Sequence, residues 1–91
     1  MVGGLRSAVK MKSVNEPVQV EVRISADGAP QPLAFAWQGH RYEIASWGRA
    51  WVEDHIRCFL VMTAASEIFE LRLLADGRWI LARALERPGL A

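Results

Sequence analysis

A strict alternation of apolar and polar residues runs through residues 17–25, PVQVEVRIS. The apolar members are Val18, Val20, Val22 and Ile24. Because successive side chains of an extended chain point to opposite faces, this period of two predicts a half-buried β-strand. The stretch SADGAPQP follows, and its Asp-Gly pair and two prolines predict a turn that ends the strand.

Two later stretches carry the signature of tight hairpins. In FAWQGHRYEI, residues 35–44, Gly39 lies between two apolar stretches and supplies the positive φ that a tight turn requires. Asp76-Gly77 lies between LRLLA and RWILARAL, and an Asp-Gly pair flanked by alternating apolar residues is a strong hairpin signal. RCFLVMTA and EIFELRLL add two further candidate strands.

The pattern as a whole predicts a mainly all-β fold. We expect a small antiparallel meander of about six strands at spacings of roughly ten residues, forming a strongly coiled sheet or an SH3-like barrel. SWGRAWVEDH, between Ile44 and Arg57, has no clean period, so we expect a loop there. Helix is limited to short turns near residues 47–54 and 84–88. Residues 17–88 form one β domain, and residues 1–16, in which Met11 is an alternative start, form a flexible tail.

Composition narrows the classes of function. The chain has 91 residues, of which 52% are hydrophobic and 23% charged, and this is typical of one small folded domain. Its net charge of +1 gives no global attraction to nucleic acid or to a membrane surface. Cys58 is the single cysteine, so no intramolecular disulfide forms and a reducing, cytoplasmic setting fits best. No apolar run is long enough for a signal peptide or a membrane span.

Residues that could perform chemistry are few. His55 and Cys58 have the spacing of a metal-ligand pair, but a structural zinc site needs four ligands and His40 is the only other histidine. Neither Cys58 with His55 nor Ser46 with His40 is accompanied by a recognisable orienting group. The glycine-rich phosphate-binding motifs are absent. We therefore expect no enzyme activity, no metal and no cofactor.

The aromatic residues allow two interpretations. Trp37, Tyr42 and Trp79 follow the strand alternation, which favours a place in the core. Trp47 and Trp51 lie in the irregular segment, and with Arg49 they are our candidate partner-binding site. Small β-barrels also bind single-stranded nucleic acid by stacking bases on aromatic side chains while basic residues follow the phosphates. The candidates for that role are His40, Arg41, Tyr42, Arg57 and Arg78.

WQGHRYEI at residues 37–44, Trp47 and Trp51 after a short spacer, FELRLL at residues 69–74 and DGRWILARAL at residues 76–85 together resemble the bacterial domain of unknown function DUF6504. The resemblance covers about residues 32–85 and lies in the order and spacing of these segments. It implies a small tryptophan-rich β domain that accompanies DNA-repair proteins, including error-prone polymerase-like chains. Gln38 and His40 stand where the family would have arginine, which weakens a role in nucleic-acid binding.

These observations favour a non-enzymatic adaptor that binds a protein partner, or a second copy of itself as a homodimer. Single-stranded nucleic-acid binding linked to DNA repair is the alternative. A third possibility is a carrier or hydrolase with a cavity inside the barrel.

Overall fold

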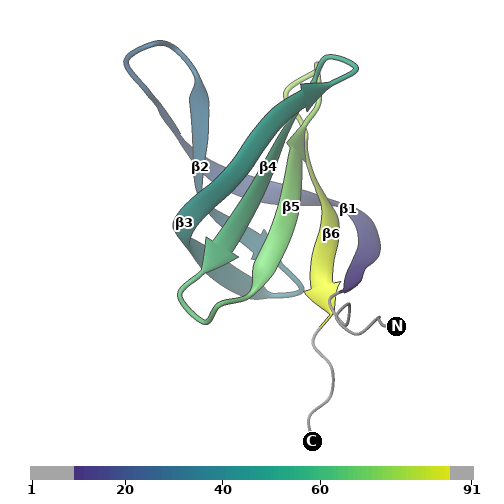
Figure 1. The fold of residues 1–91 in the computed structure, drawn as a ribbon. Coiled ribbons are helices and arrows are strands. Elements are labelled where there is room, and N and C mark those ends of the chain that lie inside the picture. The colour runs from purple at the N-terminus through teal and green to yellow at the C-terminus, as the bar shows by residue number, and fades with distance from the viewer. Residues whose placement is uncertain (1–9, 87–91) are drawn as a thin grey trace, which may run out of the picture.

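The computed structural model describes residues 10–86 as six antiparallel strands that close into a small barrel (Figure 1). The strands are β1 (Lys10–Ile24), β2 (Pro30–Trp37), β3 (His40–Glu53), β4 (Ile56–Thr63), β5 (Ile68–Leu73) and β6 (Trp79–Glu86). Each strand is a neighbour of the next along the chain, and β6 pairs with β1. The prediction of an all-β antiparallel meander is confirmed. None of the described residues belongs to a helix that is long and apolar enough to cross a membrane.

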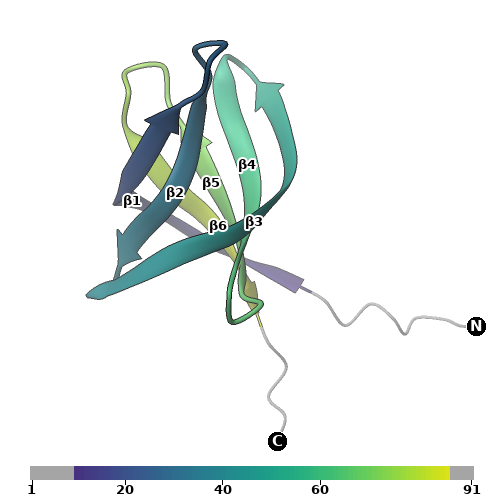
Figure 2. The same cartoon turned by 90° about the vertical axis from the view of Figure 1, so that its left-hand side faces the viewer.

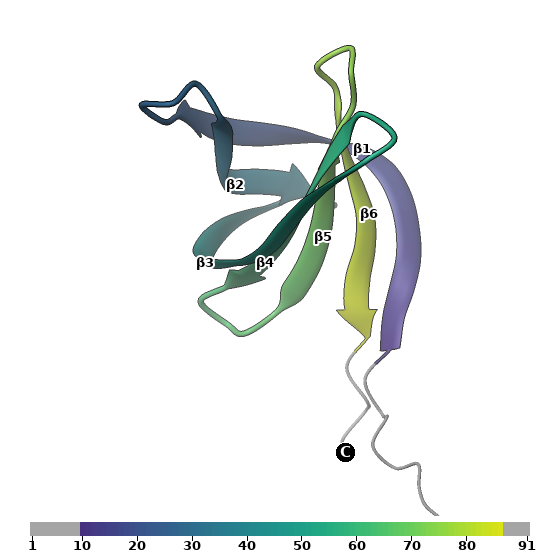
Figure 3. The same ribbon diagram turned by 45° about the horizontal axis from the view of Figure 1, so that its top comes forward.

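The barrel consists of two sheets that share β1 and β3. Residues 10–18 of β1 pair with β6, and residues 19–24 pair with β2. In the same way, residues 40–43 of β3 pair with β2, and residues 44–53 pair with β4. Figure 3 shows β1 changing direction as it passes from one sheet to the other. Each half of these two long strands therefore pairs with only one neighbouring strand in the described part of the chain.

Two element boundaries differ from the sequence prediction. β1 begins at Lys10 rather than at residue 17, because residues 10–13 pair with Glu86–Arg83 of β6. The expected tail thus contributes seven residues to the barrel, and only its residues 1–9 lie outside the described part. The predicted loop between Ile44 and Arg57 is wrong, since β3 continues to Glu53 and a two-residue turn leads into β4. Near residues 84–88, β6 runs to Glu86, and the rest lies outside the described residues.

Register shifts explain why the pattern of β3 is hard to recognise. Shifts occur between Ile44 and Ser46 and between Trp47 and Ala50. Each extra residue reverses the alternation of faces, so apolar side chains on one face do not recur at a period of two. Local sequence cannot show these shifts, because they are defined only against β4.

Two predicted turns are confirmed. Gln38 and Gly39 join β2 to β3 with φ values of 53° and 78°, as a tight hairpin with two left-handed residues requires. Asp76-Gly77 lies in the connection from β5 to β6, where the Gly77 N–H donates to the Leu74 carbonyl at 3.0 Å. Figure 2 shows that the β1–β2, β3–β4 and β5–β6 turns lie at one end of the barrel, with the other two turns towards the opposite end.

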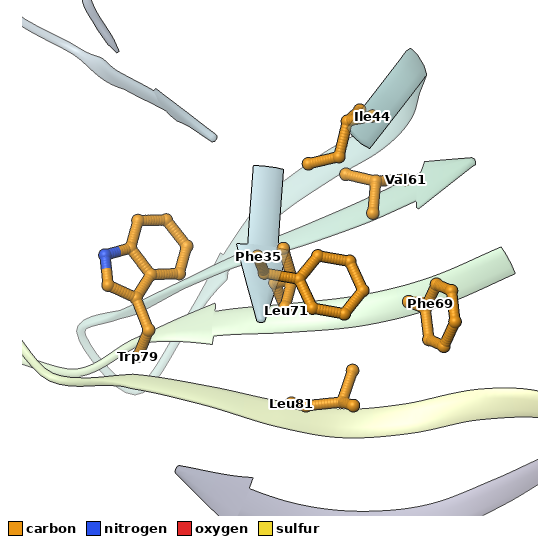
Figure 4. Packing of buried hydrophobic residues seen from close by; sticks show 7 residues of the cluster. All are labelled: Phe35, Ile44, Val61, Phe69, Leu71, Trp79 and Leu81. Atoms are coloured by element: carbon orange, nitrogen blue, oxygen red, sulfur yellow. The ribbon is translucent and has the colours of Figure 1, made fainter. Parts of the chain in front are cut away.

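The core fills the space between the two sheets (Figure 4). Its buried apolar members are Phe35, Ile44, Val61, Phe69, Leu71, Trp79 and Leu81. The ring of Phe35 stacks on Tyr42 at 5.1 Å and meets Phe69 edge-on at 5.0 Å. Trp79 is buried as predicted, whereas Trp37 and Tyr42 are half-buried and pack against the cluster.

Candidate functional site

An open seam separates β2 from β3 at the end of the barrel that carries the β1–β2 and β3–β4 turns. Backbone pairing between these strands covers only Ala34–Trp37 of β2 and His40–Glu43 of β3. Beyond that point residues 30–33 of β2 pair only with β1, and residues 44–53 of β3 pair only with β4. Figure 1 shows the β1–β2 hairpin leaning away from the β3–β4 hairpin. We call the gap between these two strand segments the seam.

Exposed apolar side chains gather around the seam. The exposed large hydrophobic residues in the described part of the chain are Val22, Ile24, Trp47, Val52 and Met62. Register places the first four on the inner face of the barrel wall. At the shift between Glu21 and Val22 the extra residue is on β2, so Val22 is opposite the buried Pro32 and Ile24 follows two residues later. Trp47 is opposite the buried Val61, and Val52 is opposite Arg57, two residues before the core-packed Phe59. Ile24 and Val52 are 63% and 67% exposed. We call Val22, Ile24, Trp47 and Val52 the apolar rim.

The two edges of the seam differ in their ability to pair with another strand. The β2 edge contains Pro30 and Pro32, which have no N–H group and cannot donate to a ladder. The β3 edge contains no proline between residues 44 and 53 and retains its backbone donors. The indole Nε1 of Trp47 donates a 2.7 Å hydrogen bond to the carbonyl oxygen of Pro32 and bridges the seam. The unprotected edge is therefore that of β3.

The predicted partner site of Trp47, Arg49 and Trp51 is divided between two faces. Trp47 is opposite Val61 and faces inwards, whereas Trp51 is opposite Cys58, which is not on the core side of β4. The extra residue between Trp47 and Ala50 causes this, because a regular strand would place residues four apart on the same face. On the outer face, the Arg49 guanidinium lies 5.2 Å from the centre of the Trp51 ring. Only Trp47 belongs to the apolar rim.

Sequence reasoning missed Val22, Ile24 and Val52 as surface residues. From the alternation in residues 17–25, all the apolar side chains of this segment were predicted to lie on one buried face. Two prolines spaced two apart at the start of β2 could have indicated this exposed region, because proline is typical of a strand edge that pairs with no other strand.

The residues predicted for nucleic-acid binding do not form one basic surface. Arg41 donates to Glu21 at 2.7 and 2.8 Å and to Glu43 at 2.8 Å. The hydrogen bonds from Arg41 lower the pKa of the Glu21 carboxyl, and those carboxylates raise the pKa of Arg41. Arg78 donates to Asp76 at 2.7 Å in the β5–β6 turn, at the opposite end of the barrel from the β2–β3 hairpin.

The remaining candidates for that role are also dispersed. Tyr42 packs its ring against Phe35 and Phe69. His40 lies beside Tyr42, with ring centres 5.7 Å apart. Arg57 is exposed at the start of β4, close enough for its charge to help lower the pKa of Asp27, after the hydrogen bonds that Ser25 and Ala29 donate to that carboxylate. Near the end of the seam, Asp27 and Arg57 therefore carry opposite charges. The five candidate residues do not form a continuous basic surface.

No family model, curated protein or solved structure matches this chain. The resemblance to DUF6504 therefore stays a prediction.

The residues considered for chemistry are not joined to one another in the described part of the chain. Cys58 is buried, its pKa is raised by burial, and its Sγ contacts the Ile56 carbonyl at 3.7 Å. Within residues 10–86 no hydrogen bond joins Cys58 to His55 or Ser46 to His40, and no group of three metal-ligating side chains occurs. Both histidines are exposed. What the seam presents is an apolar surface beside an unpaired strand edge.

Proposed function

We propose that the protein is a non-enzymatic binding module that holds an extended segment of a partner protein in the seam, as an added strand on the edge of β3. The observation that carries this proposal is the coincidence of an unpaired strand edge with the apolar rim. Added strands gain affinity from backbone hydrogen bonds and specificity from alternate side chains. Here the ladder would come from residues 44–53 of β3 and the apolar contacts from Val22, Ile24, Trp47 and Val52.

Three features favour an extended peptide as the occupant. The prolines of β2 prevent a bound peptide from forming a hydrogen-bonded ladder with the β2 edge of the seam. A single peptide strand that pairs with β3 is therefore enough to occupy the seam. Trp47 is 40% exposed, and its indole provides an apolar surface on which the peptide lies. Asp27 and Arg57, near the end of the seam, offer charged contacts to one end of the peptide. The expected ligand alternates apolar and polar residues.

The test uses twelve-residue peptides selected on the full chain from a random displayed library. Selected peptides are synthesised, and their binding is measured by calorimetry and by hydrogen exchange of the backbone amides. We expect the amides of residues 44–53 to gain protection on binding. We also expect Val52→Lys to weaken binding by about tenfold or more, since it puts a charge in place of an exposed apolar contact of the rim.

Met62→Lys is the matched control, because Met62 is also exposed and apolar but lies on β4 away from the seam. Binding lost with Met62→Lys but kept with Val52→Lys contradicts the proposal, as does a library that yields no peptide. Sedimentation velocity over a range of protein concentrations tests a homodimer. A dimer that Val52→Lys dissociates assigns the seam to a second copy of the chain.

Single-stranded nucleic-acid binding stays the alternative prediction. It requires quenching of tryptophan fluorescence by oligonucleotides that weakens steeply with added salt, because phosphate contacts release counterions. Arg57→Ala is the informative variant, since Arg57 forms no ion pair within the described residues whereas Arg41 and Arg78 do.

A further inference from the structure

A second hollow lies at the opposite end of the barrel from the seam. It has a volume of about 260 Å³ and lies where the β2–β3 hairpin approaches the start of β1 and the end of β6. Its lining consists of Lys12, Trp37, Tyr42, Glu67, Phe69, Ala84 and Leu85. Residues 10–18 of β1 pair only with β6, so β1 and the end of β2 are not joined by backbone hydrogen bonds here.

Three aromatic rings form one wall of this hollow. Tyr42 and Phe69 have ring centres 5.3 Å apart, and Trp37 lies 6.1 Å from Phe69 at an interplanar angle of 77°. Trp37 and Tyr42 are 6.4 Å apart, inclined at 41°. Rings inclined in this way present several faces to one volume, and the face of an aromatic ring carries negative charge that attracts cations.

Two carboxylates add negative charge, Glu67 in the lining of the hollow and Glu16 through its hydrogen bond to Trp37. Glu16 accepts a 3.0 Å hydrogen bond from the Nε1 of Trp37, which orients the indole and makes its ring face more electron-rich. Glu67 accepts a 3.1 Å hydrogen bond from the Thr63 hydroxyl, and its own N–H donates to that hydroxyl oxygen at 3.2 Å. The carboxylate of Glu67 is thereby held at the hollow.

The positive charge near the hollow is smaller. Lys12 also lines it, but forms no ion pair with Glu67 within the described part of the chain. Arg41, on the neighbouring surface, is occupied by Glu21 and Glu43. An incoming cation therefore meets aromatic faces and the Glu67 carboxylate, with the Glu16 carboxylate bonded to the Trp37 indole nitrogen, against the single ammonium group of Lys12. An incoming anion meets the reverse.

We propose that this hollow binds an alkylammonium group, such as a quaternary ammonium or a methylated lysine side chain. Such groups are large, weakly hydrated cations that aromatic walls hold better than they hold a small hydrated ion. Two sources share this chemistry: a free small cation, and a modified lysine on a partner protein.

The experiment titrates the full chain with choline and, in parallel, with 3,3-dimethylbutan-1-ol, which has the same shape without the charge. The readout is the indole N–H signal of Trp37 in a two-dimensional NMR spectrum, assigned by its loss in Trp37→Phe, at constant ionic strength. We expect choline to shift this signal saturably and the alcohol to bind about tenfold more weakly. Equal binding of the two, or no saturable shift up to about 50 mM choline, overturns the proposal.

Two charge variants test the sign of the interaction. Glu67→Gln removes a carboxylate and should weaken choline binding several-fold, while Lys12→Met removes the competing ammonium and should strengthen it. Glu53→Gln, at the other end of the barrel, is the matched control and should change nothing. Weaker choline binding with Lys12→Met contradicts the proposal.

A short peptide containing trimethyllysine distinguishes the two sources. The proposal predicts that it shifts the same indole signal and responds to the same two variants. Binding tighter than that of choline identifies a partner's side chain as the source, and binding no tighter identifies a free cation. A peptide that shifts other signals but leaves that of Trp37 unchanged contradicts the modified-lysine source.

Discussion

The Nε1 of Trp47 lies 2.7 Å from the carbonyl oxygen of Pro32, and this hydrogen bond joins two strands that share no backbone pair at this point. A similar bond joins Trp37 to Glu16 at the other end of the barrel. At each end, an indole thus spans a gap left where a long strand changes its neighbour. The barrel is closed by backbone pairing along part of its height and by side chains elsewhere.

We predict that Trp47→Phe destabilises the fold by about 1–2 kcal/mol, because it keeps most of the apolar contact but leaves the buried Pro32 carbonyl without its donor. Trp51→Phe is the matched control, since its Nε1 donates to the exposed Glu53 and its loss costs less than about 1 kcal/mol. The free energy of unfolding in urea measures both. Equal effects of the two variants would show that the seam does not depend on this bond.

The carboxylate of Glu70 is only 3% exposed although it lies on the outer face of the sheet. Arg72 contacts it at 2.7 Å and Arg83 at 3.1 Å. We predict that replacing both arginines by methionine costs about 3 kcal/mol, because it leaves a covered charge without a partner. Glu70→Leu should cost less, since the arginines are partly exposed and become hydrated. Thermal unfolding ranks the variants, and the reverse order would contradict this account.

Cys58 should react slowly with thiol reagents in the folded protein. It is 1% exposed, burial raises the pKa of its thiol, and Trp51 lies opposite it at the same small hollow. We predict that Trp51→Ala increases the rate of iodoacetamide labelling several-fold at about pH 8. Trp47→Ala is the control on the inner face and should have a smaller effect at equal stability. Mass spectrometry of the labelled chain gives both rates.

Turn carboxylates should give the fold part of its stability at neutral pH. The pKa of Asp76 is lowered by the backbone N–H of Arg78 and then by its guanidinium. Because the folded pKa is below the unfolded one, the contribution is complete above the unfolded pKa of about 4 and is lost as the pH falls through the lowered folded value.

Asp76→Asn should therefore flatten the dependence of unfolding free energy on pH between about pH 2 and pH 5. Asp54→Asn, in a turn where the carboxylate forms no ion pair within the described residues, serves as the control. Urea unfolding at several pH values measures the slopes. Parallel curves for the wild type and Asp76→Asn would contradict the prediction.

Local signals in the sequence predicted most of the fold but only part of the candidate site. Gly39 and Asp76-Gly77 identified their hairpins because positive φ is a property of the residue itself. Trp47 was a candidate partner-binding residue because its segment had no regular period, but the sequence left its exposure open. Ile24 was missed, since an apolar residue in phase with a strand has the same pattern whether its face is covered or exposed to solvent. Val52 lay in the expected loop, where no period showed which face it takes.

The sequence by itself determined the strand class, the tight turns and the face that each regular strand buries, because these follow from φ preferences and the period of two. The tertiary structure decided where the long strands change neighbours, and with that the seam, the aromatic hollow and the opposite orientations of Trp47 and Trp51. These features depend on register against a strand distant in the chain, and a shift of one residue reverses every side chain beyond it.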